Sequence, residues 1–158
     1  MFSTRLAALG FSAVVAVGLA GCGNNSNDGG PGPDSSTIKI SDTSLGPVLT
    51  DGAGMTLYLY TPDSGGKSVC EAACLAAWPA LEGKPAAGDG VDAALIGTIT
   101  RDDGATQATY SGHPLYYYAD DSSAGDVNGQ QTGGVWYAVS ASGSAVQGAP
   151  PADTGGGY

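Results

Sequence analysis

Positively charged residues are scarce in this sequence. Its 158 residues include five Lys and Arg residues and one His, against 15 Asp and Glu residues, which gives a net charge of −10. Nucleic-acid-binding proteins present basic surfaces to phosphates, so we expect no nucleic-acid partner. The acidic balance also argues against adhesion to anionic lipid headgroups by charge.

Common catalytic motifs are absent as well. The sequence contains no Gly-x-Ser-x-Gly, no P-loop and no dinucleotide fingerprint, and its single histidine, His113, has no second histidine for a metal triad. Adjacent carboxylates at Asp102-Asp103 and Asp120-Asp121 would point to opposite faces of a strand. A Ser-His-Asp set could be assembled around His113, but no spacing selects one. We expect a non-enzymatic protein without a cofactor.

Long apolar runs are confined to the start of the chain. Arg5 precedes an almost unbroken apolar stretch from Leu6 to Ala20. This stretch is shorter than the roughly 20 residues that cross a bilayer, and it is typical of a secretory signal. We predict a signal peptide over residues 1–21.

The end of this segment, Leu19-Ala20-Gly21-Cys22, resembles the lipobox of bacterial lipoproteins. The resemblance implies cleavage before Cys22 and lipid on its sulfur, and two or more acyl chains make such an anchor stable. The alternative is an ordinary secretory signal that ends by chance in a cysteine. Residues 22–37, rich in Gly, Pro, Asn and Asp, predict a flexible tether after the lipidated cysteine. We therefore expect a lipid-anchored protein of the cell envelope that faces the periplasm or the cell exterior.

Cysteine occurs only three times. If Cys22 carries lipid, Cys70 and Cys74 remain, and an even pair in an oxidising compartment favours a disulfide. Because the i, i+4 spacing is awkward inside a regular helix, we expect a turn or a short helical segment at 71–77. A reactive dithiol or a metal-ligand pair is the alternative, although neither a Cys-x-x-Cys motif nor a nearby histidine supports it.

An internal duplication organises the rest of the chain. The segment Leu57–Asp63 (LYLYTPD) reappears as Leu115–Asp121 (LYYYADD), 58 residues later, and the same offset carries Trp78 onto Trp136. We predict a duplicated domain at 38–142, with repeats at about 46–82 and 96–140 and a disordered tail at 143–158.

Both copies show the alternation that is typical of β-strands. In the first copy Met55, Leu57 and Leu59 alternate with Thr and Tyr residues. We expect strands at residues 46–50, 55–60, 96–100, 106–110, 115–118 and 135–139, the first of these being the first strand of the domain, and turns at 52–54, 102–104 and 111–114. The predicted fold is mostly β, with two related β-repeats packed into one small domain and a short helical turn near the Cys pair.

The repeated motif resembles the signature of a bacterial family. The residues that carry it are Tyr58, Tyr60 and Asp63 in the first copy and Tyr116, Tyr118 and Asp121 in the second, together with Trp78 and Trp136. Their spacing is similar to the Tyr-x-aromatic-x-x-Asp motif of predicted lipoproteins, also described as secreted repeats of unknown function. The resemblance implies an exported lipoprotein with tandem repeats, and it implies no particular activity.

The motif residues have two interpretations. In the structural one, Asp63 and Asp121 accept hydrogen bonds from turn amides or from a tyrosine hydroxyl and so fix loop geometry. In the functional one, the tyrosines form a flat platform for a ring-shaped or saccharide ligand. Recurrence in both halves favours the structural interpretation, since a folding motif must occur in each half whereas a binding site need occur only once.

Metal sites have weak candidates. Oxygen donors gather at Asp120, Asp121, Asp126, Asn128 and Gln130, although their spacing does not match an EF-hand loop. A copper site would have to rely on His113 with Met55, which flank corresponding turns of the two repeats. The sequence thus favours a non-enzymatic binding or envelope-structural role. A periplasmic metal-binding or thiol-redox accessory protein is the alternative.

Overall fold

The computed structural model describes residues 33–149, and the predicted signal peptide, Cys22 and most of the tether lie outside this range. The described strands are β1 (Thr37–Thr43), β2 (Gly46–Asp51), β3 (Tyr58–Tyr60), β4 (Ala86–Ala87), β5 (Ile96–Thr100), β6 (Thr106–Tyr110), β7 (His113–Pro114) and β8 (Trp136–Ala138). The helices are α1 (Ala73–Ala77) and two single 3-10 turns at Ala93–Leu95 and Thr132–Gly134. The fold is mostly β with a short helix near the Cys pair, as the sequence predicts.

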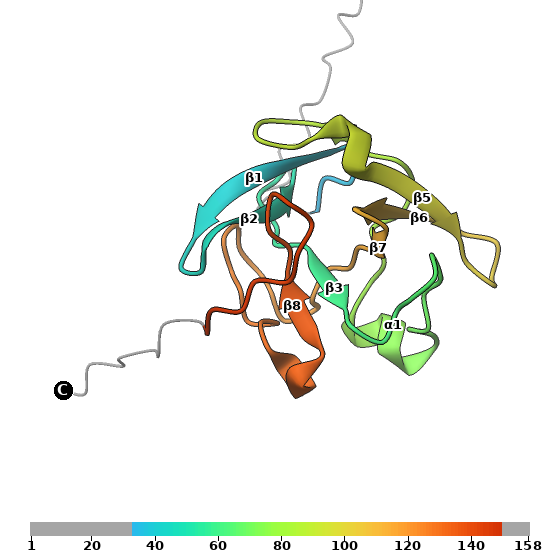
Figure 1. Cartoon of the computed structure of the whole chain (residues 1–158). Coiled ribbons are helices and arrows are strands. Elements are labelled where there is room, and N and C mark those ends of the chain that lie inside the picture. Colours follow the sequence, from blue (N-terminus) through green and yellow to red (C-terminus); the bar gives the residue numbers. More distant parts are fainter. Residues whose placement is uncertain (1–32, 150–158) are drawn as a thin grey trace, which may run out of the picture.

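Each half of the domain begins with an antiparallel hairpin. The β1–β2 hairpin opens the first half and the β5–β6 hairpin opens the second, and Figure 1 shows them on opposite sides of the molecule, with β3 and β8 between them. The expectation that the first strand is 46–50 is wrong, because β1 precedes it. Ile38 and Ile40 of β1 pack inward on either side of Lys39, which is the alternation that marks a half-buried strand.

The two halves exchange strand partners at the centre of the domain. We call 57–61 and 115–119 the motif segments and 77–81 and 135–139 the tryptophan segments. The first motif segment pairs with the second tryptophan segment through β3 and β8. The second motif segment pairs with the first tryptophan segment, where Leu81 N donates to Leu115 O at 2.9 Å and Tyr117 N donates to Pro79 O at 2.8 Å.

The two motif segments also meet each other. Tyr58 N donates to Tyr116 O at 2.9 Å, and Tyr116 N donates to Tyr58 O at 3.0 Å. Neither half therefore contains both partners of its own central strand pairing. The two repeats are thus interlocked and related by an approximate two-fold arrangement.

Alternation along the motif segments divides the core into two clusters. Leu57, Leu59 and Leu115 point into an aliphatic cluster together with Ile38 and other residues of the hairpins. The intervening tyrosines, Tyr58 and Tyr116, point into an aromatic cluster on the other face. The repeated Leu-Tyr alternation thus supplies both sides of the core at once.

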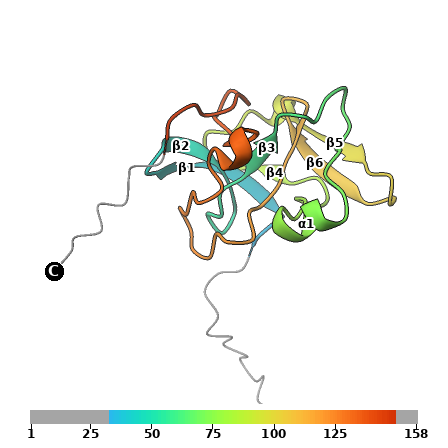
Figure 2. The same cartoon turned by 90° about the horizontal axis from the view of Figure 1, so that it is seen from below.

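The ordered domain extends further than the predicted limit of residue 142. After a turn at 140–144, Val146 N donates to Ala138 O at 2.8 Å, and Val146 packs against the aromatic cluster. The expected disordered tail is therefore wrong for residues 143–149. Seen from below in Figure 2, α1 lies on the same side as the β5–β6 hairpin. Within residues 33–149, no helix is long and apolar enough to span a membrane.

Candidate functional site

The repeated aromatic-aspartate motif forms two reciprocal side-chain hydrogen bonds between the halves. Tyr58 of the first half donates its hydroxyl to Asp121 Oδ2 of the second half at 2.6 Å. Tyr116 of the second half donates to Asp63 Oδ2 of the first half, also at 2.6 Å. We call this four-residue arrangement the Tyr–Asp clasp. It is the structural interpretation of the motif, with the added feature that each aspartate binds the tyrosine of the other repeat.

The second oxygen of each aspartate fixes a loop of its own repeat. Asp63 Oδ1 accepts the Val69 amide at 2.8 Å, and Asp121 Oδ1 accepts the Asn128 amide at 2.9 Å. Both carboxylates are buried, with 6% and 7% relative exposure for Asp63 and Asp121. All four carboxylate oxygens therefore have a donor within the protein.

Burial governs the protonation of the clasp. Loss of hydration raises the pKa of Asp63 and of Asp121 above the ordinary value of 3.8, although the tyrosine and amide hydrogen bonds act in the opposite direction. Burial and the hydrogen bond to Asp63 raise the pKa of Tyr116 to about 12. Burial also raises the pKa of Tyr58, with Asp121 adding to the effect. Both hydroxyls thus remain donors over the physiological pH range.

Four aromatic rings stack across the boundary between the halves. The Trp78 and Trp136 rings are parallel within 1°, with centroids 3.8 Å apart. Tyr118 stacks on Trp78 and Tyr60 stacks on Trp136, each with a centroid distance of 4.3 Å. The order Tyr118, Trp78, Trp136, Tyr60 alternates between the halves, so the stack joins the repeats as the clasp does.

The stack leaves little of the predicted ligand platform. Trp78 and Trp136 are each 5% exposed because they cover one another, and only the outer rings of Tyr60 and Tyr118 are partly exposed. Tyr118 donates its hydroxyl to Asp120 Oδ2 at 3.0 Å on the surface. The aromatic surfaces of the motif are used mainly on each other.

A disulfide of the first half and a buried cation of the second half have no counterpart in the opposite half. Cys70 and Cys74 are joined, as predicted, beside α1. Arg101 inserts its guanidinium beneath this loop, where Nη2 donates to Cys70 O and Nη1 donates to Ser68 Oγ at 2.8 Å and to Gln107 Oε1 at 2.6 Å. The network joins the clasp because Ser68 Oγ lies 2.5 Å from the Tyr116 hydroxyl.

Sequence reasoning missed Arg101, since a single Arg before Asp102-Asp103-Gly104 is typical of an exposed hairpin turn. The positions 58 residues away from Arg101, Cys70 and Cys74 are Thr43, Asn128 and Thr132. Comparison of the two halves thus distinguishes two kinds of feature. The clasp and the aromatic stack occur in both halves and maintain the fold, whereas the disulfide and Arg101 each occur in one half alone. The unshared features gather where α1 approaches the β5–β6 hairpin.

The acidic loop of the second half uses its oxygens internally. Asp126 Oδ2 accepts the Ser122 and Ser123 amides, each at 2.9 Å, and Asp121 is held in the clasp. His113 lies in β7 rather than in the predicted turn and pairs with Tyr110. Among residues 33–149, no group of three or more His, Cys, Asp or Glu side chains is arranged to hold a metal ion.

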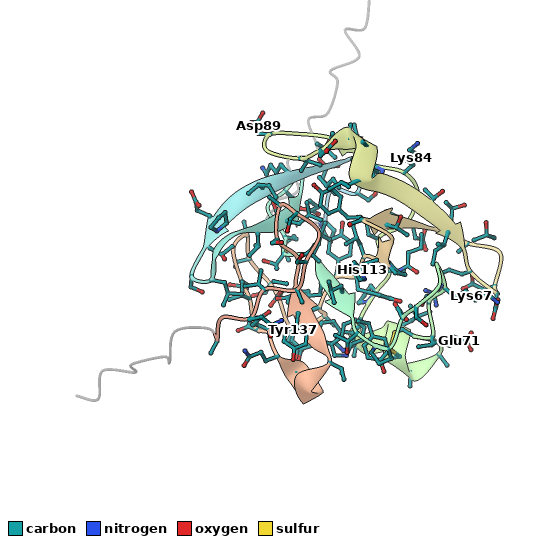
Figure 3. The ribbon with its side chains drawn as sticks, in the orientation of Figure 1. Lys67, Glu71, Lys84, Asp89, His113 and Tyr137 are labelled. Carbon is teal, nitrogen blue, oxygen red and sulfur yellow. A yellow bond between two sulfur atoms is a disulfide. The ribbon has the colours of Figure 1, made fainter. Side chains whose placement is uncertain are left out.

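Two adjoining hollows lie between α1, the first tryptophan segment and the β5–β6 turn. The larger has a volume of about 370 Å³ and is lined by Glu71, Ala72, Leu75, Arg101, Asp102 and Asp103. The smaller, of about 210 Å³, is lined by Leu75, Pro79, Ala80, Glu82, Arg101, Asp103 and Ala105. Because Leu75, Arg101 and Asp103 line both, the hollows form one groove, which we call the α1 groove. Glu71, which lines the larger hollow, projects outward from the molecule near α1 in Figure 3.

Strand exchange, the clasp and the shared stack define a class of β-domain that is built from two interlocked repeats. Two matches to one family model cover this architecture, at residues 39–82 and 97–140, and each contains one motif segment and one tryptophan segment. The chain belongs to the family described as the secreted repeat of unknown function. Membership supports an exported protein. No curated protein and no solved structure matches the sequence.

Proposed function

We propose that this chain is a lipid-anchored exported protein with a non-enzymatic binding or structural role in the cell envelope. The lipobox-like Leu19-Ala20-Gly21-Cys22 supports the anchor, and membership of a secreted family agrees with export. Lipid on Cys22 would hold the domain at a membrane, facing the periplasm or the cell exterior, through the segment that precedes β1.

The observation that supports a non-enzymatic role is the Tyr–Asp clasp. The most distinctive polar groups of the family motif are buried and hydrogen-bonded to one another, which leaves them to stabilise the domain. Catalytic acids and bases must instead reach a substrate, directly or through one water. We infer that the motif maintains the fold and that function depends on surface features of the individual protein.

Metabolic labelling with a palmitate analogue tests the anchor. We expect the wild-type protein to incorporate label and to partition into detergent, and the Cys22→Ala variant to do neither. Cys70→Ser/Cys74→Ser is the matched control and should label like the wild type. Label retained in Cys22→Ala, or absent from the wild type, would refute the anchor.

A thiol-redox role is a second candidate, supported by the disulfide beside the α1 groove. Cys70 is fully buried, whereas Cys74 is partly exposed and could be attacked by an external thiolate. Thiol counting after equilibration in glutathione buffers distinguishes the two roles. A pair that stays oxidised at physiological thiol potentials supports a structural disulfide, and a pair that cycles readily supports the redox role.

A further inference from the structure

The second half of the domain holds an extended peptide along its own outer strand edge. This peptide is residues 145–148, which run beside the outer edge of β8. Val146 N donates to Ala138 O at 2.8 Å, and the Gln130 side chain donates to Val146 O at 2.7 Å and to Gly148 O at 2.8 Å. Gln130 Oε1 accepts the Ala138 amide at 2.8 Å. The outward carbonyl of Ala138 is thus bonded by the peptide, and its outward amide is bonded by the Gln130 side chain, which we call the clamp.

The corresponding position in the first half is Ala80, 58 residues before Ala138. Ala80 forms a bridge with Tyr116 on its inner edge, as Ala138 does with Tyr58. Its outer amide and carbonyl have no hydrogen-bond partner within the described range, 33–149. The residue that corresponds to the clamp Gln130 is Ala72, whose short side chain leaves the position open.

The open edge at Ala80 lies in the α1 groove. Ala80 lines the smaller hollow and Ala72 lines the larger, so the groove occupies the place that residues 145–148 fill in the other half. An exposed strand edge with unpaired backbone groups is a ready template for an added strand. The molecule therefore contains one filled and one open version of the same site.

A buried donor on the floor of the groove also lacks an acceptor. The Arg101 side chain is 5% exposed and its other guanidinium nitrogens are hydrogen-bonded, but Nε has no hydrogen-bond partner among the described residues. The nearest carboxylate oxygen, Asp103 Oδ2, lies 3.8 Å away. A backbone carbonyl of a bound strand is the kind of acceptor that such a donor takes.

The chemistry of the groove selects its occupant. Leu75, Ala72 and Ala105 provide apolar surface, while four carboxylates stand along the groove, those of Glu71, Glu82, Asp102 and Asp103. A chain with small or branched aliphatic side chains flanked by basic ones complements this pattern. Residues 1–32 and 150–158 of this chain contain a single basic side chain, Arg5, so the basic segment belongs to a partner.

We propose that the α1 groove binds an extended, lysine-bearing peptide segment of a partner protein by strand addition at Ala80. The backbone of the peptide pairs with the amide and carbonyl of Ala80, as Val146 pairs with Ala138. An aliphatic side chain lies on Leu75, and flanking ammonium groups meet Glu71 and Glu82. This site deepens the binding role proposed above and gives it a class of partner.

A labelled synthetic peptide tests the site on the folded protein. The probe is Lys-Ala-Val-Gln-Lys-amide with a fluorophore on its N-terminal amine, so that both lysine side chains keep their charge. It copies the order of residues 145–147 between two lysines, and binding is followed by anisotropy. We expect saturable binding, and increased hydrogen-exchange protection at the Ala80 amide. A probe with Glu in place of both Lys residues should bind more weakly.

Charge reversal with a matched control separates the groove from general attraction to an acidic protein. Glu71→Lys/Glu82→Lys changes two exposed side chains on the groove and should weaken binding about 5- to 20-fold, as expected for two surface ion pairs. Asp42→Lys/Asp89→Lys makes the same change of net charge on exposed positions elsewhere, and Figure 3 shows Asp89 at the far end of the molecule from Glu71. The control should bind within about 2-fold of the wild type.

Three outcomes would overturn the proposal. They are failure of the probe to bind, equal weakening by both charge-reversal pairs, and protection changes that avoid Ala80. A doubled mass in light scattering that the probe does not reduce would instead assign the groove to a second copy of this chain. None of these results bears on palmitate labelling of Cys22, so failure of the groove and failure of the anchor are distinguishable.

Discussion

Removing either hydroxyl from the Tyr–Asp clasp should destabilise the domain, and the two removals should differ in magnitude. Tyr58→Phe takes the only side-chain donor from Asp121 Oδ2 and also takes the acceptor from the Gly129 amide, which donates to the Tyr58 hydroxyl at 3.2 Å. Tyr116→Phe takes the donor from Asp63 Oδ2, while Ser68, its other partner, keeps its bond from Arg101.

The expected loss of unfolding free energy follows from the number of hydrogen bonds that each variant loses. A hydrogen bond to a charged group contributes about 1.5–3 kcal/mol, and a buried group left unpaired costs about 1–3 kcal/mol. We expect Tyr116→Phe to lower the free energy of unfolding by about 1.5–3 kcal/mol and Tyr58→Phe by about 1 kcal/mol more. Tyr118→Phe, which loses only the exposed bond to Asp120, is the control and should change stability by less than about 0.5 kcal/mol.

Urea unfolding at pH 7, followed by tryptophan emission, measures these differences. The readout reports on the clasp region itself, since both tryptophans lie in the stack beside it. Variants of Tyr58 and Tyr116 that unfold at the wild-type midpoint would show that the clasp does not stabilise the domain. A larger loss for Tyr116→Phe than for Tyr58→Phe would contradict the role assigned to the Gly129 amide.

Three further perturbations have defined outcomes. Because the folded-state pKa of Tyr116 is raised from 10.0 to about 12, the unfolded chain ionises first, so stability should fall as pH rises through this window, and less so in Tyr116→Phe. Breaking Cys70–Cys74 with a reductant should lower the unfolding free energy by about 2 kcal/mol, as expected for so short a loop, and an unchanged urea midpoint would contradict this. In Gly129→Ala the new Cβ would lie 2.8 Å from a Trp78 ring atom, so overpacking should cost about 1–3 kcal/mol by calorimetry. Gly148→Ala, where the Cβ meets nothing within 4 Å, should melt with the wild type.

The sequence predicted those parts of the fold that depend on local pattern. The Asp102-Asp103-Gly104 turn signal placed the β5–β6 hairpin at its observed bounds, and the i, i+4 cysteines predicted a short helical segment where α1 is found. The duplication was visible because its offset is constant. The strand β1 was missed, although the alternation of Ile38 and Ile40 around Lys39 lies within the predicted domain.

The partners of the motif residues could not be predicted from one repeat. Alternation shows that Tyr58 and Tyr116 lie on the same face of their respective strands, but it does not show which aspartate each tyrosine contacts. That depends on how the two halves pack, and they pack so that each tyrosine binds the aspartate of the other repeat. Arg101 was missed for a related reason, because two of its acceptors, Cys70 O and Ser68 Oγ, are 31 and 33 residues away in the sequence.

Strand exchange between the repeats has a consequence for export. An exported chain that crosses the membrane from its N-terminus exposes the first motif segment on the far side well before residues 135–139, its pairing partners, have emerged. During that interval Leu57, Leu59 and Trp78 have no completed core to enter, so the half-exported chain exposes apolar side chains to chaperones and proteases. Folding is therefore postponed until nearly the whole domain is outside, and a chain truncated after the first repeat should be degraded rather than accumulate.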